Sequence, residues 1–380
     1  MEKGKLGFGW MRLPQKSADT TDIDMEQVKS MVDEYMAAGF NYFDTSFVYH
    51  GGKSENAIKK CLVERKARDS FILTSKLPTF AITKEEQVEE IFAQQLANCG
   101  VEYFDYFLLH NLNAIRYDRE VKDCHMFEHM KQWKAEGKIR HIGFSFHDSA
   151  DVLGRILNEH PEVEAVQIVV NYLDWEAGLI QARKCYETIR RNGCEVLIME
   201  PVKGGLLAKA PADAEKLMKE AQPDSSIASW ALRFAGALDG VLAVISGMSN
   251  LEQVRDNVAT MRNFRPLSLE EKDIIGKAAR IYRQSGPANM ADFKSLSGME
   301  AWGIAISSII EAWNNCMIQP VPGFAAEHNY FSTEKAKHGL RAEEPCITER
   351  VLLPDGTDIS ELARKAEKFL TDSMFFKYSV

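Results

Sequence analysis

The chain has 380 residues, 45% of them hydrophobic and 27% charged, which provides for a large folded core and argues against a disordered chain. Its formal net charge of -9 at pH 7 argues against nucleic acid or an anionic membrane as the main partner. The apolar runs are too short to cross a membrane and no signal-peptide pattern opens the chain, while seven scattered cysteines indicate reduced thiols in a cytoplasmic protein.

Short apolar runs alternate with longer amphipathic ones from the start of the chain to about residue 262. The short runs are rich in β-branched and aromatic residues and almost continuously apolar, as parallel strands buried on both faces are. We expect eight strands, which begin at Leu6, Asn41, Phe71, Tyr103, His141, Ala165, Cys194 and Gly240.

Amphipathic helices are expected between these strands. One follows Asp24 and ends at the C-cap signal Gly39. Another follows Thr83, which forms a capping-box pattern with Glu86. Further helices are expected over 127–137, 179–193 and 251–261. Eight strand–helix units in about 250 residues predict a (β/α)8 TIM barrel.

A doubly wound open sheet is the structural alternative to this barrel. Such a sheet needs a GxGxxG turn between its first strand and a helix, and the segment GFGWMRLPQKS does not match that pattern.

The strand–helix rhythm stops after Pro266. A helix from Ser268, another over 299–318 and a last one from about Ser360 to Asp372 are expected there. We therefore predict a barrel over 1–265 and a mainly helical extension over 266–380. The extension is too apolar for a linker, so we expect it to pack on the barrel or at a subunit interface of a homo-oligomer.

Four polar residues stand at or near successive strand ends, where a barrel of this kind carries its chemistry. Asp44 ends the second strand, Tyr49 follows in the next loop, Lys76 lies near the end of the third strand and His110 closes the fourth. A free tyrosine titrates near pH ~10, and a neighbouring Lys76 would lower that value. Asp44 would orient Lys76, and His110 would hold the substrate oxygen near Tyr49. The group suits carbonyl reduction, with a hydride supplied by a cofactor.

Several motifs resemble those of the aldo-keto reductase family. The segments NYFDTSFVYHGGKSE, FILTSK and DYFLLH are similar to the segments that carry the family's catalytic Asp, Tyr, Lys and His. The likeness extends from about Leu6 to Met261 and is greatest to a bacterial branch with MRLP near the start and GFSFHD after the fifth strand. The resemblance implies a nicotinamide cofactor bound without a Rossmann fold.

The resemblance also implies cofactor-binding positions in this sequence. Ser145 and Gln167 match the residues that hold the carboxamide, with Asn171 nearby, and Met199 stands where many members stack an aromatic ring on the nicotinamide. The remaining positions match the loop along the pyrophosphate and the segment around the adenosine 2'-phosphate: Pro201, Val202, Gly204, Gly247, Ser249, Gln253 and Asn257.

Some features depart from the family pattern. Phe146 stands where other members have Asn, and His147 is the candidate substitute. The 2'-phosphate segment lacks the usual Lys and Arg, with Arg255 and Arg262 at positions that do not match, so NADP(H) is preferred by resemblance and NAD(H) stays open. Relatives of this branch often end in a segment with clustered cysteines, but only Cys316 and Cys346 follow Pro266. No iron–sulfur cluster is expected.

The leading functional hypothesis is NAD(P)H-dependent reduction of an aldehyde or ketone to an alcohol, or the reverse, with Tyr49 as general acid. The alternatives are a Schiff-base aldolase that uses Lys76 and a slow-turnover regulatory subunit that binds cofactor. No metal is expected. The candidate substrate residues are Arg12, which could hold an anionic group, and four aromatic side chains that could line an apolar pocket: Trp10, Phe47, Phe80 and Tyr172.

Overall fold

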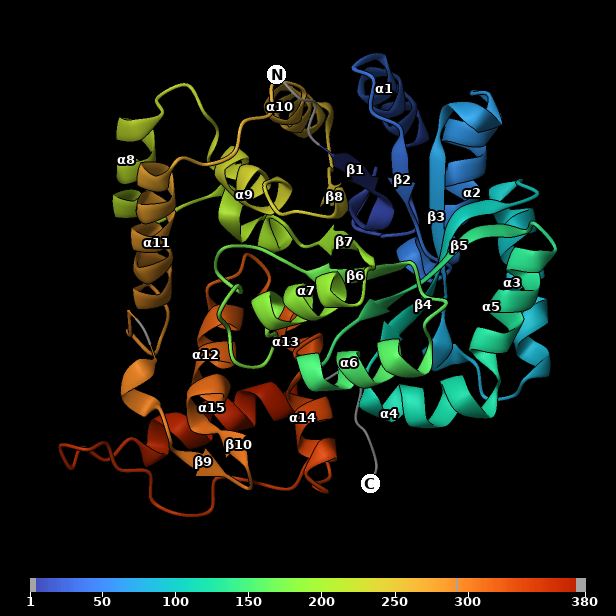
Figure 1. The fold of residues 1–380 in the computed structure, drawn as a ribbon. Coiled ribbons are helices and arrows are strands. Elements are labelled where there is room, and N and C mark those ends of the chain that lie inside the picture. The colour runs from blue at the N-terminus through green and yellow to red at the C-terminus, as the bar shows by residue number, and fades with distance from the viewer. Residues whose placement is uncertain (1–4, 292, 374–380) are drawn as a thin grey trace.

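The structure, a computed structural model, describes residues 5–291 and 293–373. Eight parallel strands pair in chain order, and the barrel closes because β1 also pairs with β8. Helices surround these strands (Figure 1), so the predicted (β/α)8 barrel is confirmed. The barrel strands are β1 (Leu6–Gly9), β2 (Tyr42–Asp44), β3 (Ile72–Leu77), β4 (Phe104–Leu112), β5 (Ile139–Phe146), β6 (Ala165–Val169), β7 (Glu195–Met199) and β8 (Val241–Gly247).

Ten α-helices belong to the connections between and after the barrel strands in the described chain. They are α1 (Met25–Ala37), α2 (Ser54–Ile58), α3 (Glu86–Cys99), α4 (Ala114–Arg116), α5 (Met126–Ala135), α6 (Ala150–Glu159), α7 (Ala182–Arg191), α8 (Ala212–Ala221), α9 (Ile227–Gly236) and α10 (Leu251–Arg262). Single turns of 3-10 or π geometry lie at Trp10–Arg12, Tyr49–Gly52, Lys59–Val63, Arg68–Ser70, Thr79–Ala81, Tyr117–Val121, Lys203–Ala208 and Lys294–Leu296.

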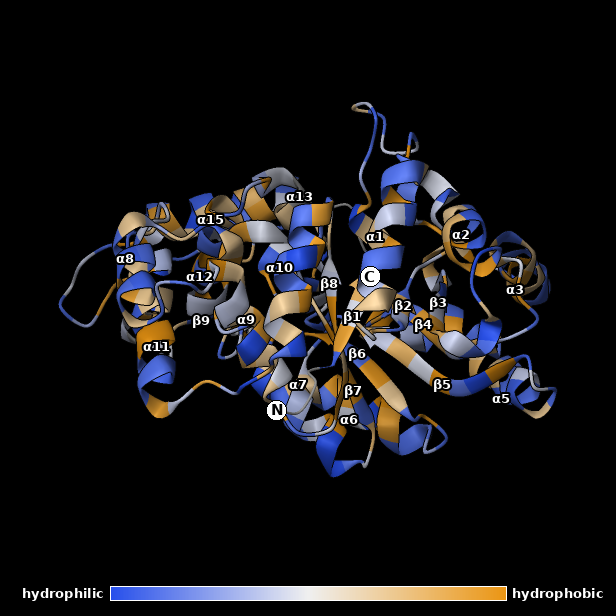
Figure 2. Cartoon of the chain, turned by 90° about the horizontal axis from the view of Figure 1, so that it is seen from above, coloured by the Kyte–Doolittle hydropathy of each residue, from blue (hydrophilic) through white to orange (hydrophobic). Residues whose placement is uncertain are grey.

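The barrel strands are buried on both faces, which explains their nearly unbroken apolar sequence. Inside the barrel, Tyr42, Leu108 and Leu197 belong to one buried cluster. Outside it, Phe8 and Phe43 pack against Tyr35 of α1, with ring centroids 5.5 and 5.3 Å away. Seen from above, the strands are largely apolar and the helices around them mix apolar and hydrophilic residues (Figure 2).

The predicted end of α1 is confirmed and the predicted start of α3 is wrong. Gly39 has φ 86° and donates its N–H to the carbonyl of Met36, as a glycine after a helix does. Thr83 does not cap α3 with Glu86. Instead, the N–H of Thr83 donates to Oε1 of Gln87 at 2.9 Å, because the helix begins two residues later than the capping-box pattern requires.

The extension contains five further helices and a small hairpin in the described residues. They are α11 (Leu269–Gln284), β9 (Glu300–Ala301), β10 (Ile304–Ala305), α12 (Ile306–Met317), α13 (Pro322–Glu327), α14 (Phe331–Lys337) and α15 (Ser360–Asp372). The single helix expected over 299–318 is wrong in its first part. Trp302 and Gly303 both have positive φ, which forms the hairpin turn, and the helix starts only at Ile306.

The extension has a core of its own and also packs on the barrel. Trp313 and Phe331 lie in its buried cluster, against which Leu179 of the barrel packs. The N–H of Gly178 donates to Glu311 of α12 at 3.2 Å. In Figure 1 the orange and red extension gathers on one side of the barrel, near α6 and α7. Its first helix, α11, instead shares a buried cluster with α8 and α9, and the division of domains at residue 265 stays a prediction.

All seven cysteines are free and buried. Within the described residues, no helix is both long and apolar enough to span a bilayer.

Candidate active site

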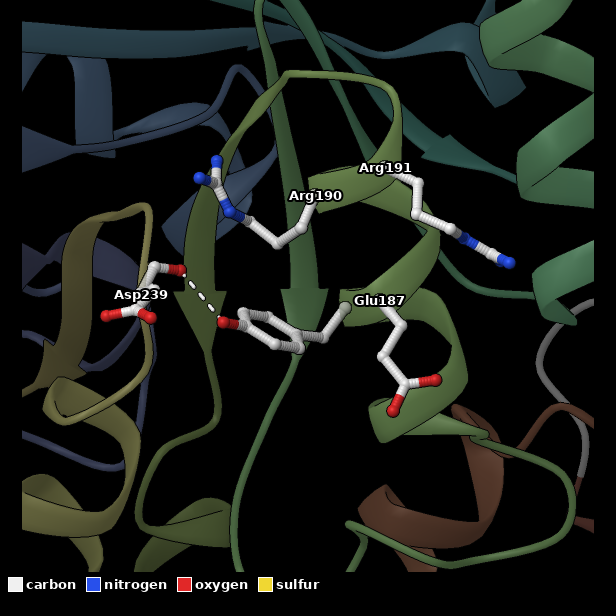
Figure 3. A pocket seen from close by; sticks show the side chains of 5 residues that line it. Glu187, Arg190, Arg191 and Asp239 are labelled. Carbon is white, nitrogen blue, oxygen red and sulfur yellow. Dashed lines mark hydrogen bonds between the residues drawn. The ribbon is translucent and has the colours of Figure 1, made fainter.

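Two hollows stand out in the described part of the molecule. The smaller, about 430 Å³, lies between α7 and the turn before β8 (Figure 3), where the hydroxyl of Tyr186 donates to the carbonyl of Asp239 at 3.0 Å. The larger, about 1050 Å³, is lined by residues at the carboxyl ends of the strands and by the extension. Because chemistry in this fold belongs to the carboxyl ends of the strands, the larger cavity is the candidate site.

Asp44 lines this cavity, and Lys76 is buried directly behind it. They end or nearly end the neighbouring strands β2 and β3, and Nζ of Lys76 lies 2.6 Å from Oδ1 of Asp44 with both side chains almost fully buried. The same Nζ donates to the carbonyl of Thr45 at 2.8 Å. The other oxygen of Asp44 accepts a hydrogen bond from Gln167 at 3.0 Å. The ammonium group of Lys76 is therefore held in a fixed position, and its charge is paired, as a buried charge requires.

Tyr49 and His110 complete the group that the sequence places at successive strand ends. Nζ of Lys76 lies 3.3 Å from the hydroxyl of Tyr49. The ring centroids of Tyr49 and His110 are 5.9 Å apart and nearly perpendicular. Nδ1 of His110 lies 3.0 Å from the hydroxyl of Ser46. The structure thus brings all four predicted side chains together: Asp44, Tyr49 and His110 line the cavity, and Lys76 is buried behind them in contact with Asp44 and Tyr49.

The protonation states follow from burial and from the ion pair. Burial lowers the pKa of Lys76, but the Asp44 carboxylate outweighs burial and holds that pKa above its ordinary value, so Lys76 stays charged. Burial raises the pKa of Tyr49, and Lys76 offsets this only in part. Lys76 does act to lower the Tyr49 pKa, as predicted, but burial outweighs it and the net shift is upward. Burial and nearby Lys76 hold the pKa of His110 well below its usual range, so its imidazole is neutral.

A second layer of side chains fixes the end of β3. Glu55 of α2 accepts hydrogen bonds from Ser75 and from Gln95, each at 2.7 Å. Gln95 also donates to the carbonyl of Lys76 at 3.0 Å. These residues and Ser46 were not predicted from the sequence. Ser46 lies inside the motif that carries Asp44 and Tyr49, so its place in that strand-end motif was the available signal.

Ten of the eleven residues implied for cofactor binding line the cavity. They are Ser145, Gln167, Met199, Pro201, Val202, Gly204, Gly247, Ser249, Gln253 and Asn257. Asn171 is not among the lining residues. Its side chain is fully buried and its Nδ2 donates to Asp174 at 2.8 Å and to the carbonyl of Glu200 at 3.2 Å. Phe146 is buried in the core, whereas His147 lines the cavity.

Two of the five candidate substrate residues, Arg12 and Phe80, line the cavity. The other three lie elsewhere. Trp10 is fully buried beside Phe8, and Tyr172 packs on Tyr282 of α11. Phe47 is partly buried and does not belong to the cavity lining.

The extension contributes a wall that the sequence analysis did not assign. His328, Asn329 and Tyr330 line the cavity between α13 and α14. The ring of Tyr330 lies 5.5 Å from that of His147 and nearly perpendicular to it. No strand-end rule marks these residues, because they belong to connections outside the barrel.

The cavity suits an elongated dinucleotide. Gln167 and Ser145 present polar atoms next to the catalytic group, Gly204 and Gly205 have φ 62° and 95°, and no atom lies within 4 Å of a Cβ built on Gly205. Bare backbone in this conformation lets a phosphate approach closely. Oδ1 of Asn315, from α12, is buried at the cavity without a hydrogen-bond partner, so it can accept a hydrogen bond from a bound ligand.

A barrel with a buried Asp–Lys pair directed at a cavity tyrosine defines a class of carbonyl oxidoreductases, and comparisons with known proteins agree. The model of the aldo/keto reductase family matches residues 5–280. The uncharacterized oxidoreductase YqkF of Bacillus subtilis (strain 168) is 25% identical over 303 residues, which cover 71% of this chain and 94% of that protein. The chain belongs to the aldo/keto reductase family and is an NAD(P)H-dependent oxidoreductase.

Solved structures share the fold. The holo form of aldo-keto reductase AKR11C1 from Bacillus halodurans has a TM-score of 0.58 and 25% identity and covers 73% of this chain and 93% of its own. An aldo/keto reductase from Klebsiella pneumoniae in complex with NADP and acetate has a TM-score of 0.57 and 20% identity. The match covers 71% of this chain and 89% of that one. At that identity the second likeness concerns the fold alone. The family match over residues 5–280 places the resemblance mainly in the barrel.

Proposed function

We propose that the chain reduces an aldehyde or ketone to an alcohol, or carries out the reverse reaction, with Tyr49 as the proton donor. The observation that carries the proposal is the position of Lys76, whose Nζ lies within hydrogen-bond distance of both Asp44 and Tyr49. A bound reduced nicotinamide would supply the hydride for the carbonyl carbon. The hydroxyl of Tyr49 gives its proton to the carbonyl oxygen, and the charge of Lys76 stabilises the phenolate left behind.

His110 acts in this proposal as a neutral group that orients the carbonyl. Because burial keeps its imidazole uncharged, it can donate one hydrogen bond to the substrate oxygen without competing as an acid. Ser46 faces Nδ1 at 3.0 Å and so fixes the ring. Asp44 keeps Lys76 charged and placed, and it does not touch the substrate.

The cofactor residues keep the roles that the family resemblance implies. Gln167 uses its N–H to bind Asp44, which leaves its carbonyl oxygen to accept from the carboxamide. The hydroxyl of Ser145 accepts from the N–H of Asn111 at 2.7 Å and can itself donate. Met199 would pack on the nicotinamide through its polarizable side chain. Gly204, Gly205 and their neighbours would lie along the pyrophosphate.

The extension, in this proposal, forms the outer wall of the substrate end. Tyr330 packs against His147. Asp148, which follows His147 in the chain, forms an ion pair at 2.8 Å with Lys337 of α14. The Asp148 carboxylate also accepts from the N–H of Ala114 after β4. The ion pair therefore joins the extension to two loops at the barrel mouth, and we infer that the extension limits which carbonyl compounds enter.

We also infer a cytoplasmic location and a homo-oligomer. Seven free, buried thiols support a reducing compartment. Most of the exposed large apolar side chains of the described chain lie on the extension, including Trp302 at 61% and Val321 at 59% exposed, and such side chains favour a contact with a second copy. Sedimentation of the chain and of Trp302→Ser tests the oligomer, which should dissociate more readily in the variant.

A carbonyl-substrate screen that follows cofactor absorbance, run with NADPH and with NADH, tests the main proposal. Turnover of at least one aldehyde or ketone is expected, and no turnover across a broad panel would contradict it. The aldolase alternative is not favoured, because Asp44 keeps Lys76 protonated and a charged amine is not a nucleophile. Borohydride with substrate should therefore leave Lys76 unmodified.

A further inference from the structure

The cavity has two ends, and the chemistry fixes what each can hold. Tyr49 and His110 line one end, and the first turn of α10 lines the other, through Ser249, Asn250 and Glu252. A hydride would have to be delivered to a carbonyl at Tyr49, so a bound cofactor would have its nicotinamide at that end and its adenosine at the start of α10. We propose, on the basis of the proposed function, that the α10 end selects the ribose 2'-hydroxyl of NAD(H) and rejects the 2'-phosphate of NADP(H).

Two carboxylates face the adenosine end. Glu252 and Asp256 lie four residues apart on α10, on one face of the helix, and both line the cavity. The side chain of Glu252 forms no hydrogen bond or ion pair with any described residue. An ionised carboxylate only accepts hydrogen bonds, so it suits ribose hydroxyls. The same charge repels a phosphate that carries about -1.5 to -2 at pH 7.

Two of the backbone N–H groups at the start of α10 that could bind a phosphate already have side-chain acceptors. The N–H of Ser249 donates to Oε1 of Gln253 at 2.7 Å. The N–H of Gln253 donates to Oδ1 of Asn250, the N-cap, at 2.9 Å. The start of α9, which also borders the cavity, has its cap Ser226 bound to Asp256 at 2.7 Å. A phosphate that bound these groups would have to displace their present acceptors.

The basic side chains are placed for a different part of the cofactor. Arg255 of α10 turns to α1, where its Nε lies 2.7 Å from Glu34, and it does not line the cavity. Among the described lining residues, Arg12 and Lys203 carry the permanently basic side chains. Lys203 is paired with buried Asp174 at 2.6 Å.

Arg12 lies against both glycine loops of the cofactor cavity. Its side chain passes 3.4 Å from a Cβ built on Gly247, and its Nη2 lies 3.4 Å from a Cβ built on Gly204. The guanidinium is therefore at the loop assigned to the pyrophosphate, which NADH and NADPH share. Arg12 strengthens binding of both cofactors in this arrangement and does not distinguish them. The preference for NADP(H) that the family resemblance implied is thus replaced by a preference for NAD(H).

Dissociation constants for NADH and NADPH, measured by calorimetry on the full chain, test the inference without turnover. NADH should bind more tightly by about tenfold, the factor that about 1.4 kcal/mol produces. Glu252→Lys should tighten NADPH binding by about tenfold and change NADH binding by less than about threefold. Glu270→Lys, the same change of charge at an exposed residue of α11 outside the cavity, should leave both constants unchanged.

Arg12→Gln tests whether Arg12 binds the pyrophosphate that both cofactors share or the 2'-phosphate that only NADP(H) carries. It should weaken NADH and NADPH by the same factor, and a loss confined to NADPH would show that Arg12 reads the 2'-phosphate and would overturn the inference. Tighter binding of NADPH than of NADH by the unaltered chain would also overturn it, while leaving the proposed reduction intact. Binding of neither cofactor would contradict the proposed function itself.

Discussion

Lys76 and Asp44 form an ion pair that is closed to water, with 2.6 Å between Nζ and Oδ1 and side chains 0% and 4% exposed. They belong to adjacent strands, since Asp44 of β2 pairs in register with Thr74 of β3. Two charges out of water are stable only while each has its partner. The pair is therefore both a catalytic arrangement and a point at which the barrel is vulnerable.

Replacing Lys76 by Met should destabilise the fold as well as stop turnover. Asp44 would then be a buried carboxylate without a counter-charge, and loss of one partner of a buried pair costs about 3–5 kcal/mol. Chemical denaturation measures this loss. The double variant Asp44→Asn with Lys76→Met should recover part of the stability and none of the activity. If the single variant is as stable as the unaltered chain, the pair is not closed to water as described.

Tyr49→Phe should remove turnover while leaving cofactor binding nearly intact. The ring is kept and only the proton donor is lost, so the rate should fall by about 100-fold to 10,000-fold, the usual contribution of a general acid. Calorimetry with NADH should give a dissociation constant within about twofold of the original. Tyr186→Phe, at the distant hollow of Figure 3, is the matched control and should keep full turnover. Full turnover in Tyr49→Phe would refute the assigned role.

The pH dependence of reduction should follow the protonated form of Tyr49. Burial raises the pKa of Tyr49 above its usual value of 10.0 despite the opposing effect of Lys76. The donor is therefore protonated throughout the neutral range, and its contribution is lost only as the pH rises through the raised pKa. Single-turnover rates of carbonyl reduction should be flat from about pH 7 to about pH 9. A decline with a midpoint near pH ~7 would contradict this protonation state.

Stability should fall as the pH is lowered below 6.5, because two cavity histidines stay neutral in the folded chain. Burial holds the pKa of His110 well below 6.5 and lowers that of His147 to about 3. The unfolded chain takes up these protons first, so the free energy of unfolding falls with falling pH. Each histidine should contribute a slope of up to about 1.4 kcal/mol per pH unit.

Denaturation of His110→Gln and His147→Gln between about pH 6.5 and pH 5 measures this slope, above the range where most carboxylates titrate. Each variant should flatten the decline. His125→Gln, whose side chain is 59% exposed in the original, should not. If the free energy of unfolding changed with pH by the same slope in all three variants, His110 and His147 would not cause the loss of stability.

Much of the fold and the catalytic group could be predicted from the sequence, because both depend on local pattern. Apolar runs in the sequence predict the strands. Parallel strands place their carboxyl ends at the same end of the barrel. Asp44, Lys76 and His110 each stand at or near a strand end, so their meeting required no knowledge of packing. Tyr49 lies in the turn directly after β2.

Residues whose direction depends on distant partners could not be placed in this way. Asn171 turns from the cavity because it binds Asp174 and the carbonyl of Glu200. Tyr172 turns to α11, where it packs on Tyr282, a residue more than a hundred positions further along the chain. The wall formed by Tyr330 follows from how the extension packs, which no periodicity in the sequence records.

Gly178→Ala should loosen the contact between the extension and the barrel. A Cβ on Gly178 would lie 1.9 Å from Oγ and 2.9 Å from Cβ of Ser308 on α12, so α12 must move, and overpacking of this kind costs about 1–3 kcal/mol. We expect faster proteolytic cleavage within 299–373. We also expect KM to change more than kcat does. Gly154→Ala, where the nearest atom is 3.7 Å away, should be neutral or stabilising. Unchanged cleavage in Gly178→Ala would mean that this contact does not hold the extension in place.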